Sequence, residues 1–275
     1  MSSFSGSRWL LPALMFVLAA VLFAPVMRWL GSQWLSNDYY SHGPLIPLVA
    51  GFFGWRALAR QARAGEDVAL LLAGAGVLFY LIALFQQAYH LAALAMMVTV
   101  AGAVAAYWGW AGLKKVLFPL AWLIFMIPFP FVEASSLPLS LFTGQIATRL
   151  MQLAGLDVRV QGAAVSLPGA QLVVGAQCSG VRSIITLLAL AAIFTYIVQG
   201  SWWRKALLFL AIIPIAIIGN IFRVSSLLLV ANQWGAQAGF TYYHDYSGFV
   251  FFALAFSLML LMARFLRCHT IRNDL

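Results

Sequence analysis

The chain has 275 residues, of which 64% are hydrophobic and 8% charged, and its mean hydropathy is +0.94. Soluble domains carry roughly 45–50% apolar and about 25% charged residues, so this composition excludes a soluble globular protein and predicts an all-α polytopic membrane protein. The net charge of +9 is spread in small groups between apolar runs, a pattern that records membrane topology and gives no support for a nucleic-acid partner.

Eight apolar runs approach the length of about 20 residues that a helix needs to cross a bilayer. The run that contains Pro214 and Gly219 is interpreted as one kinked helix. No appended soluble domain is expected, so residues 1–275 are predicted to form a single integral membrane domain. The eight predicted spans cover about 10–30, 43–60, 68–86, 89–110, 115–132, 179–200, 204–234 and 247–266.

Cationic side chains collect on the cytoplasmic side of short loops, so their distribution predicts the orientation. With the N-terminus and C-terminus both cytoplasmic, eleven of the 16 cationic residues fall inside and five outside. The outer segments are then the loops at 31–42 and 235–246 and the long connection at 131–178. Arg182 and Arg223 belong to the outer five, but they lie within helical segments.

The long outer connection changes its periodicity along its length. A stripe of apolar residues at spacings of three and four predicts an amphipathic helix near the membrane–water boundary. After Gly155 the period becomes two, with a turn at Pro168-Gly169, which predicts a small β-hairpin outside the bilayer. Together these elements occupy about residues 139–175. The stripe consists of Leu139, Phe142, Ile146, Leu150 and Leu153.

Cys178 stands in a short hydrophilic stretch, Gln177-Cys178-Ser179-Gly180, directly before a predicted span. A lone cysteine beside a membrane helix is more often a small apolar residue than a reactive one. A thiol at a helix N-terminus, however, feels the positive end of the macrodipole, which favours the thiolate. Arg182, one turn further on, is a supporting charge.

Arg223 is the clearest ionisable residue inside a predicted span, where charges are costly and functional by default. Asn220, three residues earlier, shares its helix face. Arg223 could instead snorkel outward, but the boundary lies about eleven residues away, roughly 16 Å along the helix. A functional role is preferred.

His244 precedes the last span, on the same predicted side as Cys178. Cysteine and histidine on elements distant in sequence are the arrangement that nucleophilic acyl transfer needs. An arginine such as Arg223 can stabilise the thiolate or the oxyanion. Asp38 and His42, in the first outer loop, either orient the site and bind substrate or cap the second span.

Metal and cofactor motifs are not found. No pair of histidines or cysteines shows ligand spacing, and no glycine-rich phosphate motif occurs. Cys268 and His269 fall at the cytoplasmic end, away from the predicted site. The sequence predicts neither a metal nor a cofactor.

Five segments together resemble the exosortase/archaeosortase family, over about residues 38–250. These are NDYYSHGPLIP, LDVRVQGAAVSLPGAQLVV, CSGVRS at the start of a span, NIFR in a later span and HDYSG before the last one. The resemblance implies a membrane cysteine peptidase or transpeptidase, with Cys178 as nucleophile, His244 as general acid and base, and Arg223 stabilising charge. Ser179, Asn220 and Arg182 would support the site, and Gln177 departs from the small or acidic residue of many relatives.

The resemblance also implies the partners. Substrates would be exported proteins that end in a short motif of the PEP-CTERM type, a transmembrane helix and a basic tail, and a lipid or glycan would accept the acyl group. The expected location is a bacterial inner membrane with the site facing the periplasm, in a system linked to exopolysaccharide, or an archaeal membrane. Two alternatives stay open: a transporter or non-enzymatic subunit of polysaccharide assembly, and a protease that uses water as acceptor.

Overall fold

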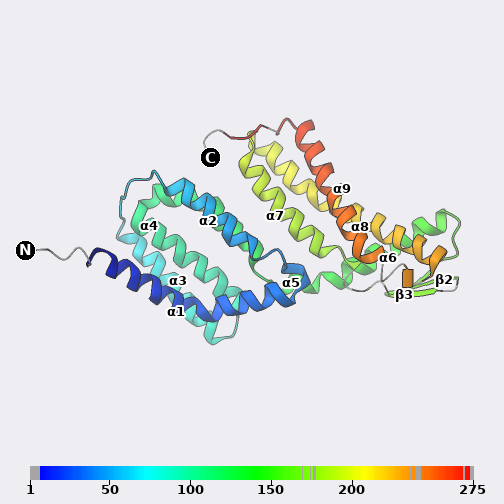
Figure 1. The fold of residues 1–275 in the computed structure, drawn as a ribbon, viewed down its shortest axis with the longest axis horizontal. Coiled ribbons are helices and arrows are strands. Elements are labelled where there is room, and N and C mark those ends of the chain that lie inside the picture. The colour runs from blue at the N-terminus through cyan, green and yellow to red at the C-terminus, as the bar shows by residue number, and fades with distance from the viewer. Residues whose placement is uncertain are drawn as a thin grey trace, which may run out of the picture. The chain divides into compact units, whose positions relative to one another are not determined.

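The computed structural model describes residues 7–168, 170–173, 175, 178–235, 237–238, 243–268 and 270–272. The chain divides into two compact units, Met1–Pro128 and Phe129–Leu275, and each is described by itself. Figure 1 labels the elements, which are helices apart from three short strands in the second unit. The prediction of one integral membrane domain stays a prediction.

The first unit is helical, and its main contact is the pairing of α3 with α4. Small residues bring the two backbones together: a Cβ on Gly102 would collide with the Ala73 nitrogen, and one on Gly76 would lie 2.5 Å from the Thr99 hydroxyl. Close backbone approach at small residues is typical of helix pairs in membranes. The elements are α1 (Ser7–Ser36), η1 (Asp38–Tyr40), α2 (Leu45–Leu58), α3 (Val68–Phe85), α4 (Tyr89–Trp122) and η2 (Leu123–Met126).

Helix α4 contains the boundary between two predicted spans. Gly109 leaves the helical conformation with φ 70° and ψ 177°, and a Cβ there would lie 2.6 Å from the Ala64 carbonyl oxygen. The predicted spans at 89–110 and 115–132 therefore meet at this break, without a separate loop. The predicted span at 115–132 ends earlier than expected, because η2 ends at Met126.

The second unit combines a helix lying against α8, a small sheet and three long helices. Helix α8 runs continuously past Pro214, as expected for a single helix over this stretch. The elements are α5 (Pro130–Ala134), α6 (Ser136–Leu153), β1 (Arg159–Gln161), β2 (Ala164–Leu167), β3 (Ala170–Val173), α7 (Val181–Ile197), α8 (Trp202–Trp234) and α9 (His244–Phe265).

Helix α6 confirms the predicted helix but buries a face that the apolar stripe did not indicate. Its small and hydroxyl residues are buried, including Ser140, Thr143 and Ala147, and α6 packs on α8. From the predicted stripe, Phe142 is 48% exposed and Leu153 is 85% exposed. The small side chains allow close contact with α8, whereas the stripe stays half-buried or exposed, as a helix at the membrane–water boundary requires.

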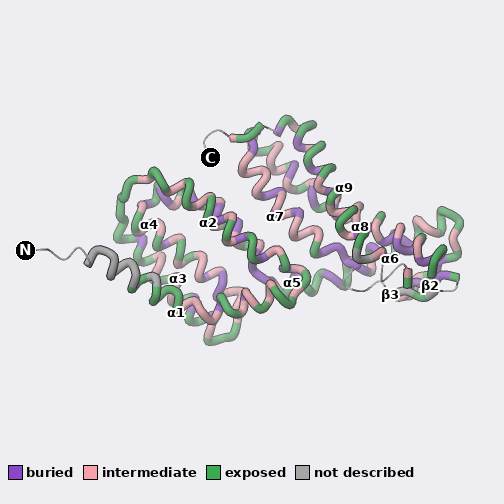
Figure 2. The backbone as a smooth tube through the Cα atoms, in the orientation of Figure 1, coloured by how far each residue is buried: buried purple, intermediate pink, exposed green. Residues whose placement is uncertain are grey.

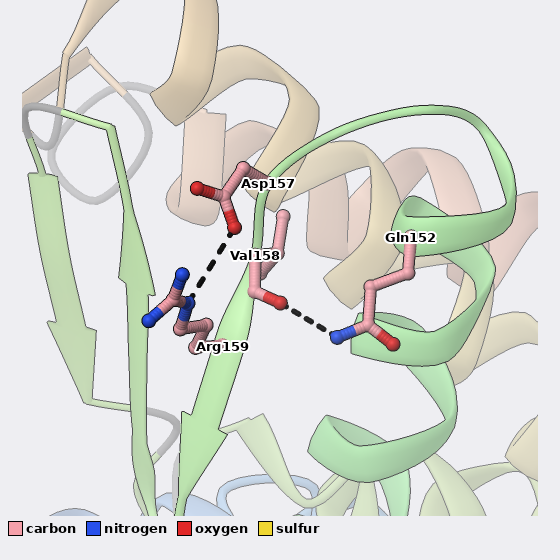
Figure 3. A network of polar contacts seen from close by, with 4 residues as sticks. All are labelled: Gln152, Asp157, Val158 and Arg159. Atoms are coloured by element: carbon pink, nitrogen blue, oxygen red, sulfur yellow. Dashed lines mark hydrogen bonds and ion pairs between the residues drawn. The ribbon is translucent and has the colours of Figure 1, made fainter.

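The predicted β-hairpin is a three-stranded antiparallel sheet in the order β1-β2-β3. A first turn at Gly162, with φ 59°, adds β1 to the expected pair. Gln152 of α6 donates a hydrogen bond from Nε2 to the Val158 carbonyl at 2.7 Å, which ties the helix to β1 (Figure 3). The neighbouring Asp157–Arg159 ion pair, 3.6 Å long, is exposed on both sides and contributes little.

The helices expose more large apolar side chains than the surface of a soluble protein does. Leu71 of α3 is 73% exposed and Phe249 of α9 is 80% exposed, and Figure 2 shows exposed residues along the helices of both units. Four segments among the described residues are long and apolar enough to cross a membrane: Val68–Phe85, Tyr89–Met126, Trp202–Trp234 and Tyr246–Phe265. Helices α2 and α7, with 14 and 17 residues, are shorter. The polytopic class is confirmed, and the number of eight spans stays a prediction.

Candidate active site

Cys178 lies in a tight turn before α7, outside the membrane-spanning segments, and its side chain is 4% exposed. Its backbone nitrogen donates to the Gly175 carbonyl at 2.9 Å. The Ser179 hydroxyl accepts from the Val181 nitrogen at 3.3 Å, which satisfies the first free N–H of the helix. These two local hydrogen bonds fix the turn independently of its contacts with other elements.

Helix α8 holds this turn from the side. Asn220 donates from Nδ2 to the Cys178 carbonyl at 2.8 Å, and both residues are buried. Gly180 has φ 76°, and a Cβ on it would lie 2.6 Å from the Asn220 Cγ. Only glycine combines this left-handed backbone with so close an approach.

Apolar residues cover the thiol. Cys178 belongs to a buried cluster formed by α6, the sheet and the C-terminal half of α8, with Tyr243 packed against it. The sheet, whose last strand ends at Val173, shortly before Cys178, therefore serves as a cover over the thiol. The other members of the cluster are Ala147, Val158, Val165, Leu167, Val224, Leu227, Leu228 and Ala231.

Burial dominates the electrostatics of the thiol. Burial raises the pKa of Cys178, and the charge of Arg223 lowers it by a smaller amount. The net pKa is raised because the apolar cluster removes the sulfur from water. The contribution of the helix macrodipole, which favours the thiolate, stays a prediction, and α7 itself begins at Val181.

Arg223 connects α8 to α9. Its Nε donates to the Ser247 hydroxyl at 3.2 Å, and Ser247 is 3% exposed. Arg223 and Asn220 also line one narrow pocket between α7, α8 and α9, whose free space of about 10 Å³ suits a single water molecule. The other residues that line it are Ser183, Leu187, Ala216, Gly219, Gly248, Phe251, Phe252 and Ala255.

The remaining predicted site residues are placed as follows. Helix α9 begins at His244, but the side chain of His244 lies outside the described residues, as does Gln177. Arg182 is exposed in the first turn of α7. Asp38 and His42 belong to the first unit, where Asp38 is exposed and the His42 ring stacks on Tyr40 with centroids 6.2 Å apart.

Two features of the site were not inferred from the sequence. Ser247 lies within HDYSG, where the sequence indicates no role for it, and the bond from Asn220 to the Cys178 carbonyl joins residues 42 positions apart. For the role of Asn220, the sequence offered one indication, which is that its helical spacing places it on the same face as Arg223. In the described part of the chain, no three His, Cys, Asp or Glu side chains come together in a group that could hold a metal ion.

The fold and site define a polytopic membrane protein with a buried cysteine. The charge of an arginine on a long apolar helix acts on the pKa of this cysteine. The family described as transmembrane exosortase matches residues 34–261, and the chain belongs to this family. No curated protein and no solved structure matches the chain. The family resemblance inferred from the sequence motifs is confirmed.

Proposed function

We propose that the chain is a membrane-embedded cysteine transpeptidase that cleaves C-terminal sorting signals of exported proteins. The observation that carries this proposal is that one helix, α8, both holds the turn of Cys178 and carries the guanidinium of Arg223. Asn220 fixes the Cys178 backbone, and Arg223, one turn further, provides the charge that lowers the thiol pKa against the effect of burial. A cysteine with only a packing role does not need either contact.

The proposed reaction has two acyl-transfer steps. The Cys178 thiolate attacks the carbonyl carbon of the scissile peptide bond, a thioester forms, and the C–N bond breaks. His244, having taken the thiol proton, returns it to the leaving amine. The acceptor's nucleophile then attacks the thioester, passes its proton to His244 and releases the thiolate. Arg223 stabilises the thiolate or the oxyanion of each tetrahedral intermediate.

The burial of Cys178 supports transfer over hydrolysis. The cover formed by α6 and the sheet keeps water from the sulfur, so a bound acceptor would compete better for the thioester. We assign the substrate to the class of proteins with a short motif, a transmembrane helix and a basic tail. By the distribution of cationic residues, the thiol would face the periplasmic side of an inner membrane, or the outer side of an archaeal one.

The test is a processing assay in cells that carry a tagged substrate of this class. Cys178→Ala should abolish the cleaved product while the protein still inserts in the membrane. Cys268→Ala, at the only other cysteine and equally buried, is the matched control and should process normally. Cleavage retained by Cys178→Ala at the parent rate would overturn the nucleophile assignment.

A transporter, or a non-enzymatic subunit of polysaccharide assembly, is the second candidate. The pocket between α7, α8 and α9, with a membrane-embedded arginine in its wall, is the observation that favours it. This alternative requires that Cys178→Ser is tolerated while Arg223→Ala is not. A cysteine enzyme should lose function in both variants.

A further inference from the structure

Ser247 is the buried partner through which Arg223 is held from the neighbouring helix. The Arg223 Nε lies 3.2 Å from the Ser247 hydroxyl oxygen, across the contact between α8 and α9. Ser247 lies in the first turn of α9 and is almost fully buried, whereas Arg223 is half-buried. A bond at Nε fixes the rotation of the guanidinium about its stem.

The bond matters because of what else α8 holds. Asn220 bonds the Cys178 carbonyl to α8, and the Cα of Arg223 belongs to the same helix. The turn with the thiol and the backbone of Arg223 are therefore both fixed to α8. The rest of the Arg223 side chain is long and flexible. Its position relative to the thiol is therefore set from a third element, α9, through Ser247. Gly248, next in the chain, also lies beside the guanidinium, since a Cβ there would lie 3.8 Å from a terminal nitrogen, at van der Waals distance.

We infer that Ser247 is a positioning residue, which fixes the guanidinium of Arg223 where its charge acts on Cys178. This inference rests on the proposed function for its catalytic meaning. The geometry itself, a hydrogen bond between α8 and α9 beside the turn held by Asn220, does not depend on it.

Four other charged residues on the elements around Cys178 are exposed to solvent, unlike Arg223. The elements packed against the thiol carry Arg149 on α6, Asp157 and Arg159 at β1, and Arg182 on α7, and all four are exposed to solvent. The side chains of His244 and Asp245 lie outside the described residues. Among the described groups, Arg223 is the charge that acts on the thiol and lowers its pKa.

The experiment measures the alkylation rate of Cys178 as a function of pH, in membranes and in a Cys268→Ala background with iodoacetamide as the probe. The reagent reacts with the thiolate, so the midpoint of the profile reports the pKa of the thiol. Ser247→Ala should move the midpoint to higher pH and slow alkylation about threefold at pH 7.5, which corresponds to a midpoint higher by roughly half a pH unit. Ser247→Thr, which keeps the hydroxyl, should restore the parent profile. Ser257→Ala is the control, because Ser257 lies on the same helix, is exposed, and donates its hydroxyl to the Ala253 carbonyl of that helix.

A purely structural role gives a different result. Loss of packing would admit water to the thiol and so move the midpoint to lower pH, opposite to the shift expected here, because burial is what raises this pKa. In an Arg223→Gln background, Ser247→Ala should cause no further change in the midpoint, because both changes act through one charge. The inference is overturned if Ser247→Ala leaves the midpoint unchanged, or if it moves the midpoint equally in both backgrounds. Alkylation does not require substrate, so this outcome is independent of the processing assay on Cys178→Ala.

Discussion

Gly180→Ala is the substitution that tests most directly how the Cys178 turn is held. The new Cβ would lie 2.6 Å from the Asn220 Cγ and 2.9 Å from its Cβ, and the backbone at this position has φ 76°. Neither group can move easily, because Asn220 is buried in the middle of α8 and bonded to the Cys178 carbonyl. The turn must therefore separate from α8 or adopt another backbone conformation.

The magnitude has two parts. A left-handed conformation costs an alanine roughly 1–2 kcal/mol relative to glycine. Displacing the turn also breaks the buried bond from Asn220 and leaves a polar group unsatisfied, which costs roughly 1–3 kcal/mol. Gly155→Ala is the matched control, because Gly155 has φ 87° and open space around its Cβ position. For Gly155→Ala, the free energy of unfolding should fall only by the first part, whereas for Gly180→Ala it should fall by about 2–5 kcal/mol in all.

Two measurements check this prediction. Equilibrium unfolding in mixed micelles compares the free energy of unfolding of Gly180→Ala with that of Gly155→Ala. Iodoacetamide labelling of Cys178, in a Cys268→Ala background, should become faster in Gly180→Ala because the turn leaves its apolar cover. If the two glycine variants are equally stable and Cys178 is labelled at the parent rate in both, the close approach of Gly180 to Asn220 does not hold the turn.

Two further predictions concern charge and packing. Arg223→Gln removes the cation that lowers the Cys178 pKa, so the alkylation profile should move to higher pH, and alkylation at neutral pH should slow about tenfold for each pH unit by which the midpoint rises. Arg223→Lys should keep part of the effect, and an unmoved profile in Arg223→Gln would contradict the assignment. Gly109→Ala should destabilise the first unit, because its φ is 70° and its Cβ would lie 2.6 Å from the Ala64 carbonyl oxygen. Gly54→Ala, in open space on helix α2, should not lower the midpoint of thermal unfolding in detergent, and equal midpoints for both variants would refute the prediction for Gly109.

The sequence by itself determined the class, the helices and the family. Long apolar runs must satisfy their backbone polar groups internally in lipid, so hydropathy alone locates the helices to within a few residues. The spacing of Asn220 and Arg223 placed them on one helix face, and both line the same pocket. The segment order from NDYYSHG to HDYSG indicated the family that the comparison confirms.

The tertiary structure alone decided how the thiol is surrounded. From the sequence, the helix and hairpin at about 139–175 are expected to roof the site, but only the packing shows that Cys178 is buried beneath them and that this burial raises its pKa. The face of α6 that packs on α8 also needed the structure, because hydropathy identifies large apolar residues, whereas close packing on α8 selects small ones, such as Thr143 and Ala147. The bonds from Asn220 to Cys178 and from Arg223 to Ser247 join residues that are 42 and 24 positions apart. Such contacts depend on how whole helices pack, which is why sequence spacing could place the residues on their helices but could not pair them.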